Sequence, residues 1–354
     1  MTKLLIVDDS PLMRRLLTTI FEAAGDFEIE VARGGEEAIS KLDSWQPDVI
    51  TLDIQMPGMD GLTCLDRIML ERPCPVVMLS SLTREGAEET LEAMALGAVD
   101  FVAKPRGAIS LEIEAIAPHL IETVRTAARS RVSRASRLAE RIRMRMANAL
   151  AAPRKRASTS HPRLATDALV VVGTSTGGPP ALDALLAPMP ADFPCPIVIA
   201  QHMPASFTGP LARRLDRLCA LDVVEVDRPT PLLPGHAYVA RGDADMIVSR
   251  RGGMLTALPA PAGDHPWHPS VDRLVASALQ QVAPENLIGV LMTGMGTDGA
   301  ARMAELRTLG GHVIAESAET AVVWGMPGAL VAAGGASQIL PLEDIARALL
   351  ARLA

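Results

Sequence analysis

The stretch ALVVVGTSTGGPPALDALL, residues 168 to 186, decides how the second half of this 354-residue chain folds. Its first five residues predict a buried strand, the glycines and hydroxyls that follow predict a tight turn, and the remainder predicts a helix. Glycine permits a sharp reversal that a side chain would block. Ser175 is therefore held at the tip of the turn, beside a helix N-terminus whose amides favour negative charge, as a nucleophile is.

Two other interpretations of this turn stay open on the local sequence. Serine and threonine hydroxyls also cap helices, and glycine-rich turns at helix starts also bind phosphate groups. The turn lacks the lysine of a P-loop, and its glycine spacing differs from that of dinucleotide-binding turns. Only residues elsewhere in the chain can decide among nucleophile, helix cap and phosphate cradle.

Length and composition are typical of a soluble protein of about two domains. The chain is 49% hydrophobic and 21% charged, and no apolar run approaches the roughly 20 residues that span a bilayer. The N-terminus reaches Asp8 and Asp9 after only a few apolar residues, unlike a signal peptide, so we expect a cytoplasmic protein. The four cysteines have no metal-binding spacing, and we expect reduced, mostly buried thiols.

Charge is distributed unevenly along the chain. Residues 125 to 163 hold twelve Lys or Arg and one acid, Glu140, a net charge of +11, so the remainder carries −18 of the total of −7. Apolar residues recur with helical spacing up to about Ala152, and the periodicity is lost after Pro153. We therefore expect a basic helical linker and tether over residues 126–165. A helix that packs or self-associates is favoured over a polyanion-binding one, because aromatic interleaving and DNA-reading motifs are absent.

The first third of the chain alternates short β-rich runs with helical patterns five times, which predicts a doubly wound parallel sheet. Asp8 and Asp9 end the first predicted strand and Asp53 ends the third, at the edge where open α/β sheets bind ligands. Carboxylates so close repel one another unless a hard cation joins them, and oxygen ligands suit Mg²⁺. Ser80 and Lys104 follow the fourth and fifth strands and add a hydroxyl and a cation at the same edge.

This part of the chain, residues 1–125, closely resembles the receiver domain of two-component response regulators. The resemblance implies that Asp53 accepts a phosphoryl group from a histidine kinase beside a bound Mg²⁺. The metal ligands that it implies are Asp9, Asp53 and the backbone carbonyl of Gln55, with Asp8 assisting. It also implies that Ser80 and Lys104 contact the phosphoryl group and that Phe101 is the aromatic switch residue.

Two further polar residues follow buried strands in the second half. His202 lies just past the strand predicted over residues 196–200, and Asp298 lies a few residues beyond the strand predicted over 287–292. Because the carboxyl ends of parallel strands share one edge, Ser175, His202 and Asp298 can meet in one crevice. They fit a hydrolytic triad, in which histidine takes the serine proton and a buried aspartate orients the imidazole. Singly, they also fit a structural histidine and a turn residue or helix cap.

The stretch between these strands is expected to hold a hairpin that turns at Gly252 and Gly253. His265 and His268 enclose a proline, which argues against a helical metal-binding face, so we assign them no metal. The segment from His268 to Asp272 is instead expected to line the pocket.

The second half, residues 166–354, resembles the catalytic domain of the chemotaxis response regulator protein-glutamate methylesterase family. The stretches that carry the resemblance are GTSTGG at 173–178, QHMP at 201–204, LPGHAY at 233–238, PSVD at 269–272, TGMGTDG at 293–299 and GMP at 325–327. The resemblance implies that Ser175, His202 and Asp298 are catalytic. It suggests the backbone amides of Thr176 and Met295 for the oxyanion hole.

Taken together, the two resemblances imply an α/β protein that acts as a phosphorylation-activated serine hydrolase. It would remove γ-methyl groups from glutamyl side chains of chemoreceptors, deamidate receptor glutamines, and need no cofactor at the hydrolase site. Thr174 and Thr297 depart from the family, which often has Ala and Asn there. The alternative is a receiver-controlled regulator whose second domain binds a partner or nucleotide without chemistry. We expect neither stable nucleic-acid binding nor membrane insertion.

Overall fold

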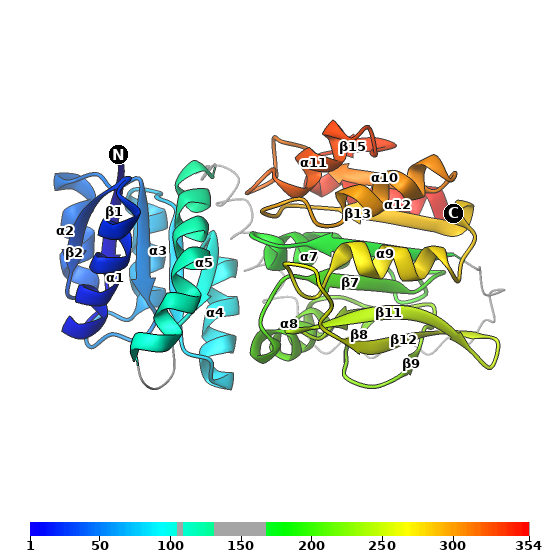
Figure 1. Ribbon diagram of the computed structural model, residues 1–354, viewed down its shortest axis with the longest axis horizontal. Coiled ribbons are helices and arrows are strands. Elements are labelled where there is room, and N and C mark those ends of the chain that lie inside the picture. Colours follow the sequence, from blue (N-terminus) through cyan, green and yellow to red (C-terminus); the bar gives the residue numbers. More distant parts are fainter. Residues whose placement is uncertain (105–108, 131–167, 354) are drawn as a thin grey trace. The chain divides into compact units, whose positions relative to one another are not determined.

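The computed structural model of the chain describes residues 1–104, 109–130 and 168–353. The chain divides into two compact units, Met1–Met146 and Ala147–Ala354, and each has a parallel sheet of its own (Figure 1). All but the first five residues of the predicted linker and tether lie outside the described residues. Among the helices that the structure describes, none combines the length and the apolar character needed to cross a bilayer.

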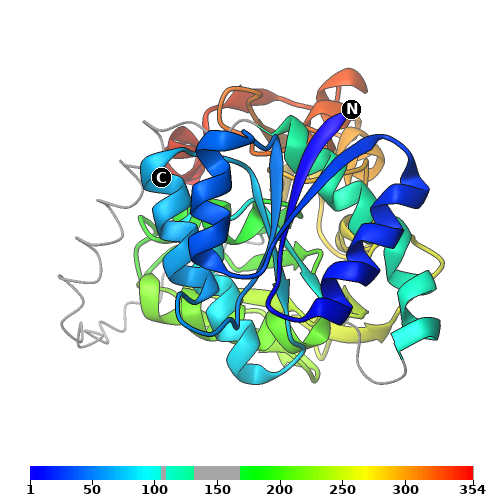
Figure 2. The same ribbon diagram turned by 90° about the vertical axis from the view of Figure 1, so that its left-hand side faces the viewer.

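Five successive βα units build the first unit, as the alternating pattern predicts. They are β1 (Thr2–Val7), α1 (Pro11–Ala24), β2 (Phe27–Ala32), α2 (Gly35–Ser44), β3 (Val49–Asp53), α3 (Gly61–Glu71), β4 (Val76–Ser80), α4 (Arg84–Leu96), β5 (Asp100–Ala103) and α5 (Ile109–Arg129). The sheet order is β2-β1-β3-β4-β5, and all neighbours are parallel. Helices α1 and α5 cover one face, and α2, α3 and α4 cover the other (Figure 2). The predicted doubly wound sheet is confirmed.

Local sequence explains how α1 begins and why β1 is buried. Ser10 is the N-cap and its hydroxyl accepts a hydrogen bond from the amide of Met13 at 3.4 Å. Pro11 occupies the first helical position, where an amide would have no partner within the helix. Residues 4–7 of β1 are fully buried, because helices cover both faces of the sheet. Each buried aliphatic side chain contributes about 1.5–3 kcal/mol to the stability of the fold.

Helix α5 crosses the predicted boundary between receiver and linker at residue 125. The helix runs to Arg129. Arg125 makes hydrogen bonds of 2.8 and 2.9 Å to Asp26, and its guanidinium lies 5.9 Å from the ring centroid of Phe27. The first basic residue of the charged segment is therefore paired within the first unit.

The second unit alternates strands and helices in a longer series. Its elements are β6 (Leu169–Thr174), α7 (Gly178–Leu186), β7 (Ile197–Gln201), α8 (Ala205–Leu218), β8 (Asp222–Val226), β9 (Thr230–Pro231), β10 (His236–Ala240), β11 (Ala244–Arg251), β12 (Met254–Pro261), α9 (Val271–Leu279), the 3₁₀ helix η1 (Pro284–Asn286), β13 (Leu287–Leu291), α10 (Ala300–Thr308), β14 (His312–Glu316), α11 (Met326–Ala332), β15 (Gln338–Leu340) and α12 (Leu342–Leu353).

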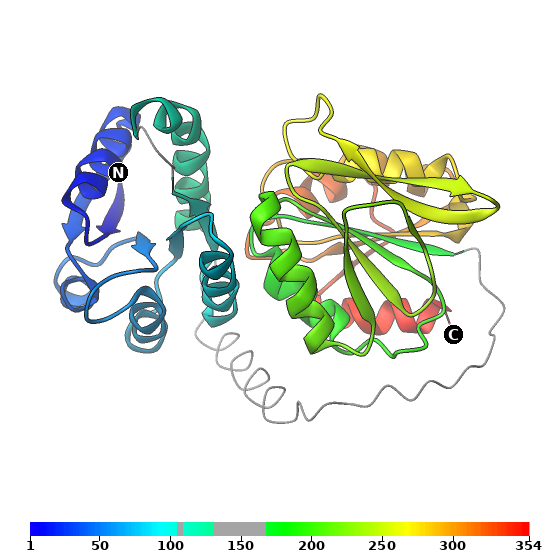
Figure 3. The same cartoon turned by 90° about the horizontal axis from the view of Figure 1, so that it is seen from below.

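Seven of these strands form a parallel sheet in the order β15-β14-β13-β6-β7-β10-β8. Helices α7, α8 and α12 lie on one face, and α9, α10 and α11 lie on the other (Figure 3). The predicted hairpin is β11 and β12, which pair with β9 in a separate antiparallel sheet. It turns at Gly252 and Gly253, whose φ angles of 57° and 84° favour glycine. The predicted α/β unit with a mainly parallel sheet is confirmed.

Candidate active site

Three neighbouring strands bring the candidate catalytic segments to one edge of the second sheet. β6 lies between β7 and β13, and Thr174 at the end of β6 pairs with Gln201 at the end of β7. Ser175 and His202 each follow this pair directly. The amide of His202 donates to the carbonyl of Thr174 at 3.1 Å. The amide of Ser175 donates to the carbonyl of Thr293, beyond β13, at 3.0 Å. The sheet register therefore sets Ser175 and His202 on adjacent strand ends.

Gln201 joins these two strand ends through its side chain. The residue is 2% exposed, and its Oε1 accepts a hydrogen bond from the Thr174 hydroxyl at 2.6 Å. Its Nε2 donates to the carbonyls of Ser175 and His202, each at 3.0 Å. Gly178 leaves room for the amide, because a Cβ there would lie 1.9 Å from Oε1. Sequence analysis gave Gln201 no role, although a polar residue directly after an apolar run was a usable signal.

His202 and Asp298 form a buried hydrogen-bonded pair. Nε2 of His202 lies 2.8 Å from Oδ2 of Asp298, and the two side chains are 7% and 3% exposed. Nδ1 of His202 is buried and has no hydrogen-bond partner in the described part of the chain. One ring nitrogen is thus engaged by the carboxylate, while the other has no partner among the described residues.

The N-terminus of α9 holds the carboxylate of Asp298. The amides of Val271 and Asp272 donate to its two oxygens at 2.7 and 3.0 Å, and the Ser270 hydroxyl lies 3.2 Å from Oδ1. Burial raises the pKa of Asp298, but the hydrogen bond and charge of His202 and the two amides outweigh it. The pKa therefore lies below its ordinary value, and Asp298 is ionised at neutral pH. These donors belong to the segment that the sequence predicted beside the pocket.

The turn after β13 packs directly against Ser175. A Cβ on Gly294 would lie 2.7 Å from the Cβ of Ser175, so a larger residue does not fit there. The Thr293 hydroxyl donates to the carbonyl of Thr176 at 2.8 Å. Thr176 is buried and Met295 is half-buried. Thr176 directly follows Ser175, and the turn places Met295 beside it, so both residues expected at the oxyanion hole lie at this edge.

A buried glutamate, Glu316, anchors this turn from the end of β14. Glu316 is 1% exposed, and its carboxylate accepts from the amide of Thr293 at 2.8 Å and from the hydroxyl of Thr320 at 3.0 Å. Burial raises the pKa of Glu316 to about 7 in spite of these hydrogen bonds. The sequence does not predict the role of Glu316, because its partner Thr293 follows a different strand, β13.

In the first unit, Asp8, Asp9 and Asp53 gather at the carboxyl edge of the sheet. One oxygen of each carboxylate lies within 4.8 Å of the others. Nζ of Lys104 lies 2.7 Å from Asp53 and 2.9 Å from Asp8. Burial lowers the pKa of Lys104, but the hydrogen bonds and charges of these two aspartates outweigh it and hold the pKa above its ordinary value. The cluster therefore offers oxygen ligands to a cation beside a fixed positive charge.

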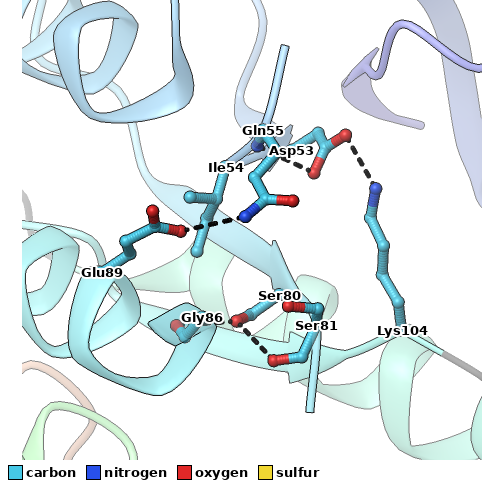
Figure 4. A pocket seen from close by; sticks show the side chains of 8 residues that line it. All are labelled: Asp53, Ile54, Gln55, Ser80, Ser81, Gly86, Glu89 and Lys104. Carbon is cyan, nitrogen blue, oxygen red and sulfur yellow. Dashed lines mark hydrogen bonds and ion pairs between the residues drawn. The ribbon is translucent and has the colours of Figure 1, made fainter. Parts of the chain in front are cut away.

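A cavity of about 120 Å³ opens beside Asp53 (Figure 4). Gln55, Ser80 and Lys104 are among the residues that line it. The amide of Gln55 donates to Oδ1 of Asp53 at 3.3 Å. The hydroxyl of Ser80 accepts from the hydroxyl of Thr90 on α4 at 2.6 Å. All the residues predicted for the phosphorylation site therefore lie at this edge, and Thr90 is a neighbour that the sequence did not suggest.

Of the remaining chemical candidates, His265 is exposed, His268 pairs with a buried carboxylate and the cysteines are free thiols. Nδ1 of His268 lies 2.9 Å from Oδ1 of Asp245, whose side chain is fully buried. The four cysteines are free, and three of them are buried. Burial raises the pKa of these three thiols, Cys64, Cys74 and Cys195, to about 12.

The first unit of this chain is a parallel α/β unit with clustered aspartates at the carboxyl edge of its sheet. The second is a parallel α/β unit that carries a serine, a histidine and an aspartate at its own carboxyl edge. This combination defines a response regulator with a hydrolase output domain. The model of the CheB methylesterase family matches residues 170–349, and that of the response regulator receiver domain matches residues 4–115. The chain belongs to the CheB methylesterase family.

Similar proteins match over nearly the whole chain. A protein named protein-glutamate methylesterase/protein-glutamine glutaminase 2 from Rhodopseudomonas palustris is 56% identical, covering 99% of this chain and 98% of its own length. Protein-glutamate methylesterase/protein-glutamine glutaminase 3 from Rhodospirillum rubrum is 52% identical, and the alignment covers 98% of this chain and 95% of that protein. The crystal structure of the Thermotoga maritima CheB methylesterase catalytic domain is 36% identical with a TM-score of 0.51, covering 52% of this chain and 98% of that domain.

Proposed function

We propose that this chain hydrolyses γ-methyl esters on glutamyl side chains of chemoreceptors and deamidates glutamines at such sites. Relatives that align over nearly the whole chain carry the names of both activities, which supports the substrate class. The observation that carries the proposal is the buried 2.8 Å hydrogen bond between His202 and Asp298 at the strand edge where Ser175 follows β6. A nucleophile, a base and an orienting acid at one edge suit ester hydrolysis.

The reaction would proceed through an acyl-enzyme. The hydroxyl of Ser175 attacks the ester carbonyl while Nδ1 of His202 takes its proton, and Asp298 stabilises the imidazolium. The imidazolium then protonates the leaving methoxide, and methanol departs. Water, deprotonated by His202, attacks the acyl-serine; the imidazolium returns the proton to the departing Ser175 oxygen, and glutamate is released. The backbone amides of Thr176 and Met295 would stabilise the oxyanion of each tetrahedral intermediate.

For the first unit, the proposal is that Asp53 is phosphorylated by the histidine kinase of a two-component system. The clustered carboxylates of Asp8, Asp9 and Asp53 are hard oxygen donors and fit a Mg²⁺ ion. The carbonyl of Gln55 would be a fourth ligand from the protein. Bound Mg²⁺ offsets negative charge on a phosphoryl group during its transfer.

Two residues at this site would act on the phosphoryl group itself. The ammonium of Lys104, held between two carboxylates, would pair with a phosphoryl oxygen. The Ser80 hydroxyl would donate to another oxygen after releasing its present partners. Phosphorylation of Asp53 would thereby shift the receiver between two states, of which the unphosphorylated one covers the catalytic crevice.

The proposed domains are a receiver over residues 1–125, a basic linker and tether over 126–165, and a catalytic domain over 166–354. Helix α5 of the first unit runs to Arg129, across the first of these boundaries. The protein is proposed to be cytoplasmic, because its kinase and the methylated segments of its receptors would act there.

Methanol release from methylated receptor membranes tests the activity. We expect the wild-type chain to release methanol, more rapidly with a small phosphodonor, and Ser175→Ala to release none above background. Wild-type rates in Ser175→Ala would rule out the proposed chemistry.

A further inference from the structure

Trp267 lies between the two parts of the candidate hydrolase site. Its indole is parallel to the imidazole of His202, with ring centroids 6.1 Å apart and an interplanar angle of 7°. This spacing is within the range of aromatic pairs that stabilise one another. The benzo edge of the indole lies against Gly296, where a Cβ would be 2.8 Å from Cζ2 and 2.9 Å from Cη2. One side chain therefore borders both the base and the turn that carries Met295.

Asp245 fixes the loop that carries Trp267. This aspartate, on β11, is fully buried and accepts four hydrogen bonds from residues on both sides of the tryptophan. The donors are the amides of Gly263 and Ser270 at 3.1 and 2.7 Å, Nδ1 of His268 at 2.9 Å and Nη1 of Arg273 at 2.6 Å. A buried carboxylate with this many donors holds its partners firmly, because each unpaired group would be costly. The indole is consequently attached to a rigid frame.

The frame also connects with the catalytic pair. Ser270, whose amide binds Asp245, lies with its hydroxyl 3.2 Å from Asp298. Asp298 in turn engages Nε2 of His202. The imidazole is thus held at its edge by a carboxylate, while Trp267 lies along its face. Together these contacts restrict both the position and the tilt of the ring.

We propose that Trp267 is a positioning residue of the esterase: it keeps the imidazole of His202 and the Gly294–Gly296 turn in fixed relation and shields the imidazole face from water. The inference rests on the proposed function. It assigns the indole no bond to the substrate. Its effect is to hold the imidazole, whose Nδ1 is unpaired in the described part of the chain, where it would take the Ser175 proton, and to keep the turn that carries Met295 fixed beside it. Trp267 would therefore act on the chemical step more than on substrate binding.

The test is steady-state methanol release from methylated receptor membranes by the full, unphosphorylated chain. Trp267→Ala should lower kcat on the order of 10- to 100-fold, as small misplacements of catalytic groups do, with KM changed much less. Trp267→Phe should recover most of kcat, because a flat ring is retained. Trp45→Ala is the matched control, because it removes an indole that is also half-buried but lies in the receiver. This variant should keep the wild-type kcat.

Two measurements make the outcome decisive. Circular dichroism and the thermal midpoint, taken on every variant, separate misfolding from misplacement, and Trp267→Phe remains informative if Trp267→Ala fails to fold. A wild-type kcat in Trp267→Ala, or a loss of kcat in Trp267→Phe as large as in Trp267→Ala, would overturn the inference. Ser175→Ala separates it from the proposed function: activity in that variant refutes the esterase itself, whereas inactivity there with full activity in Trp267→Ala refutes only the role of Trp267.

Discussion

Asp298 keeps its negative charge inside the protein because several donors meet its two oxygens. His202 supplies one hydrogen bond, and the start of α9 supplies the others through Ser270, Val271 and Asp272. An isolated buried carboxylate would become protonated instead. The same donors keep the acceptor oxygen of Asp298 in place against the imidazole of His202. The ionised state of Asp298 and its orientation toward the imidazole therefore have the same structural cause.

Replacing Asp298 by Asn tests this account at a single residue. The amide keeps the volume but removes the charge that stabilises the imidazolium and selects its tautomer, so we expect kcat to fall by about 10³- to 10⁴-fold with little change in KM. Methanol release is the measurement. Asp264→Asn, an exposed change in the same unit, is the control. Less than a tenfold loss in Asp298→Asn would mean that this carboxylate does not assist the base.

Glu316 gives a prediction about pH and stability. Its pKa is raised from 4.5 to about 7 in the folded chain, so between these values the folded state binds a proton that the unfolded state has released. Stability from this group is full below about pH 4.5 and is lost as the pH rises through 7. Glu316→Gln should remove this dependence, which is on the order of 1–3 kcal/mol. Urea unfolding of both proteins at pH 5 and pH 8 measures it, and an unchanged difference between the two pH values in the variant would contradict the assignment.

At this scale the sequence identified polar residues that lie within a few positions of the end of an apolar run. Ser175, His202 and Asp298 were predicted to share an edge because their strands end beside them. Gln201 and Glu316 were not assigned, because their importance arises from partners on other strands. Side-chain contacts between distant segments depend on register, which a single sequence does not reveal.

At the scale of elements, the strand-turn-helix from β6 to α7 sets the geometry of the site. The turn needs glycine at Gly178, where a Cβ would meet the Gln201 amide at 1.9 Å, and at Gly177, whose φ is 76°. The hydrogen bonds of Gln201 to Ser175 and His202 leave that amide no room to move. The close approach of helix and amide is therefore part of how the nucleophile and base are aligned.

Gly178→Ala tests the role of this turn. We expect a loss of roughly 1–3 kcal/mol in stability from overpacking and at least a tenfold loss in kcat, because Gln201 must shift and release the two backbone carbonyls. Thermal unfolding and methanol release measure the two effects. Gly34→Ala is the control, since its φ of 176° suits any residue and a Cβ there meets nothing within 4 Å. Full activity in Gly178→Ala would show that Gln201 does not position the site.

Element periodicity predicted the first unit well, because its strands are short, apolar and evenly separated by amphipathic helices. The hairpin of β11 and β12 was also predicted, from its paired glycines. The end of α5 was not predicted, because helical periodicity continues into the basic segment, and the pairing of Arg125 with Asp26 is a contact that the sequence does not reveal. Strands β14 and β15 and helices α10 to α12 were not predicted, since sequence analysis relied on motifs rather than periodicity there.

At the scale of the whole molecule, one chain contains a receiver unit and a hydrolase unit. The acidic cluster and Lys104 lie in the first unit, and Ser175, His202 and Asp298 lie in the second. Coupling between them requires that phosphorylation change how the receiver interacts with the catalytic unit. Two predictions follow, one for each end of this coupling.

The first concerns the phosphoryl acceptor. Asp53→Asn should abolish incorporation of label from a small phosphodonor or kinase, because the amide cannot form the acyl phosphate. Asp43→Asn, an exposed acid on α2, should be labelled as the wild type is. Undiminished labelling of Asp53→Asn would mean that a different residue is phosphorylated.

The second concerns inhibition by the receiver. A fragment of residues 166–354 should release methanol faster than the unphosphorylated full chain, because no receiver covers its crevice, and a phosphodonor should speed the full chain but not the fragment. If the fragment were no faster, the hypothesis that the unphosphorylated receiver blocks the catalytic crevice would be wrong. The assignment of hydrolase activity would not be affected by that result.

The central claim is that Ser175 becomes acylated during hydrolysis of a γ-glutamyl methyl ester. Its most direct test is mass spectrometry of the full chain, quenched with acid during turnover of a methylated receptor peptide and then digested. The account predicts a peptide-sized adduct on the fragment that contains Ser175, transient in the wild type and absent from Ser175→Ala. Continued hydrolysis by Ser175→Ala, or an adduct on a different residue, would contradict it.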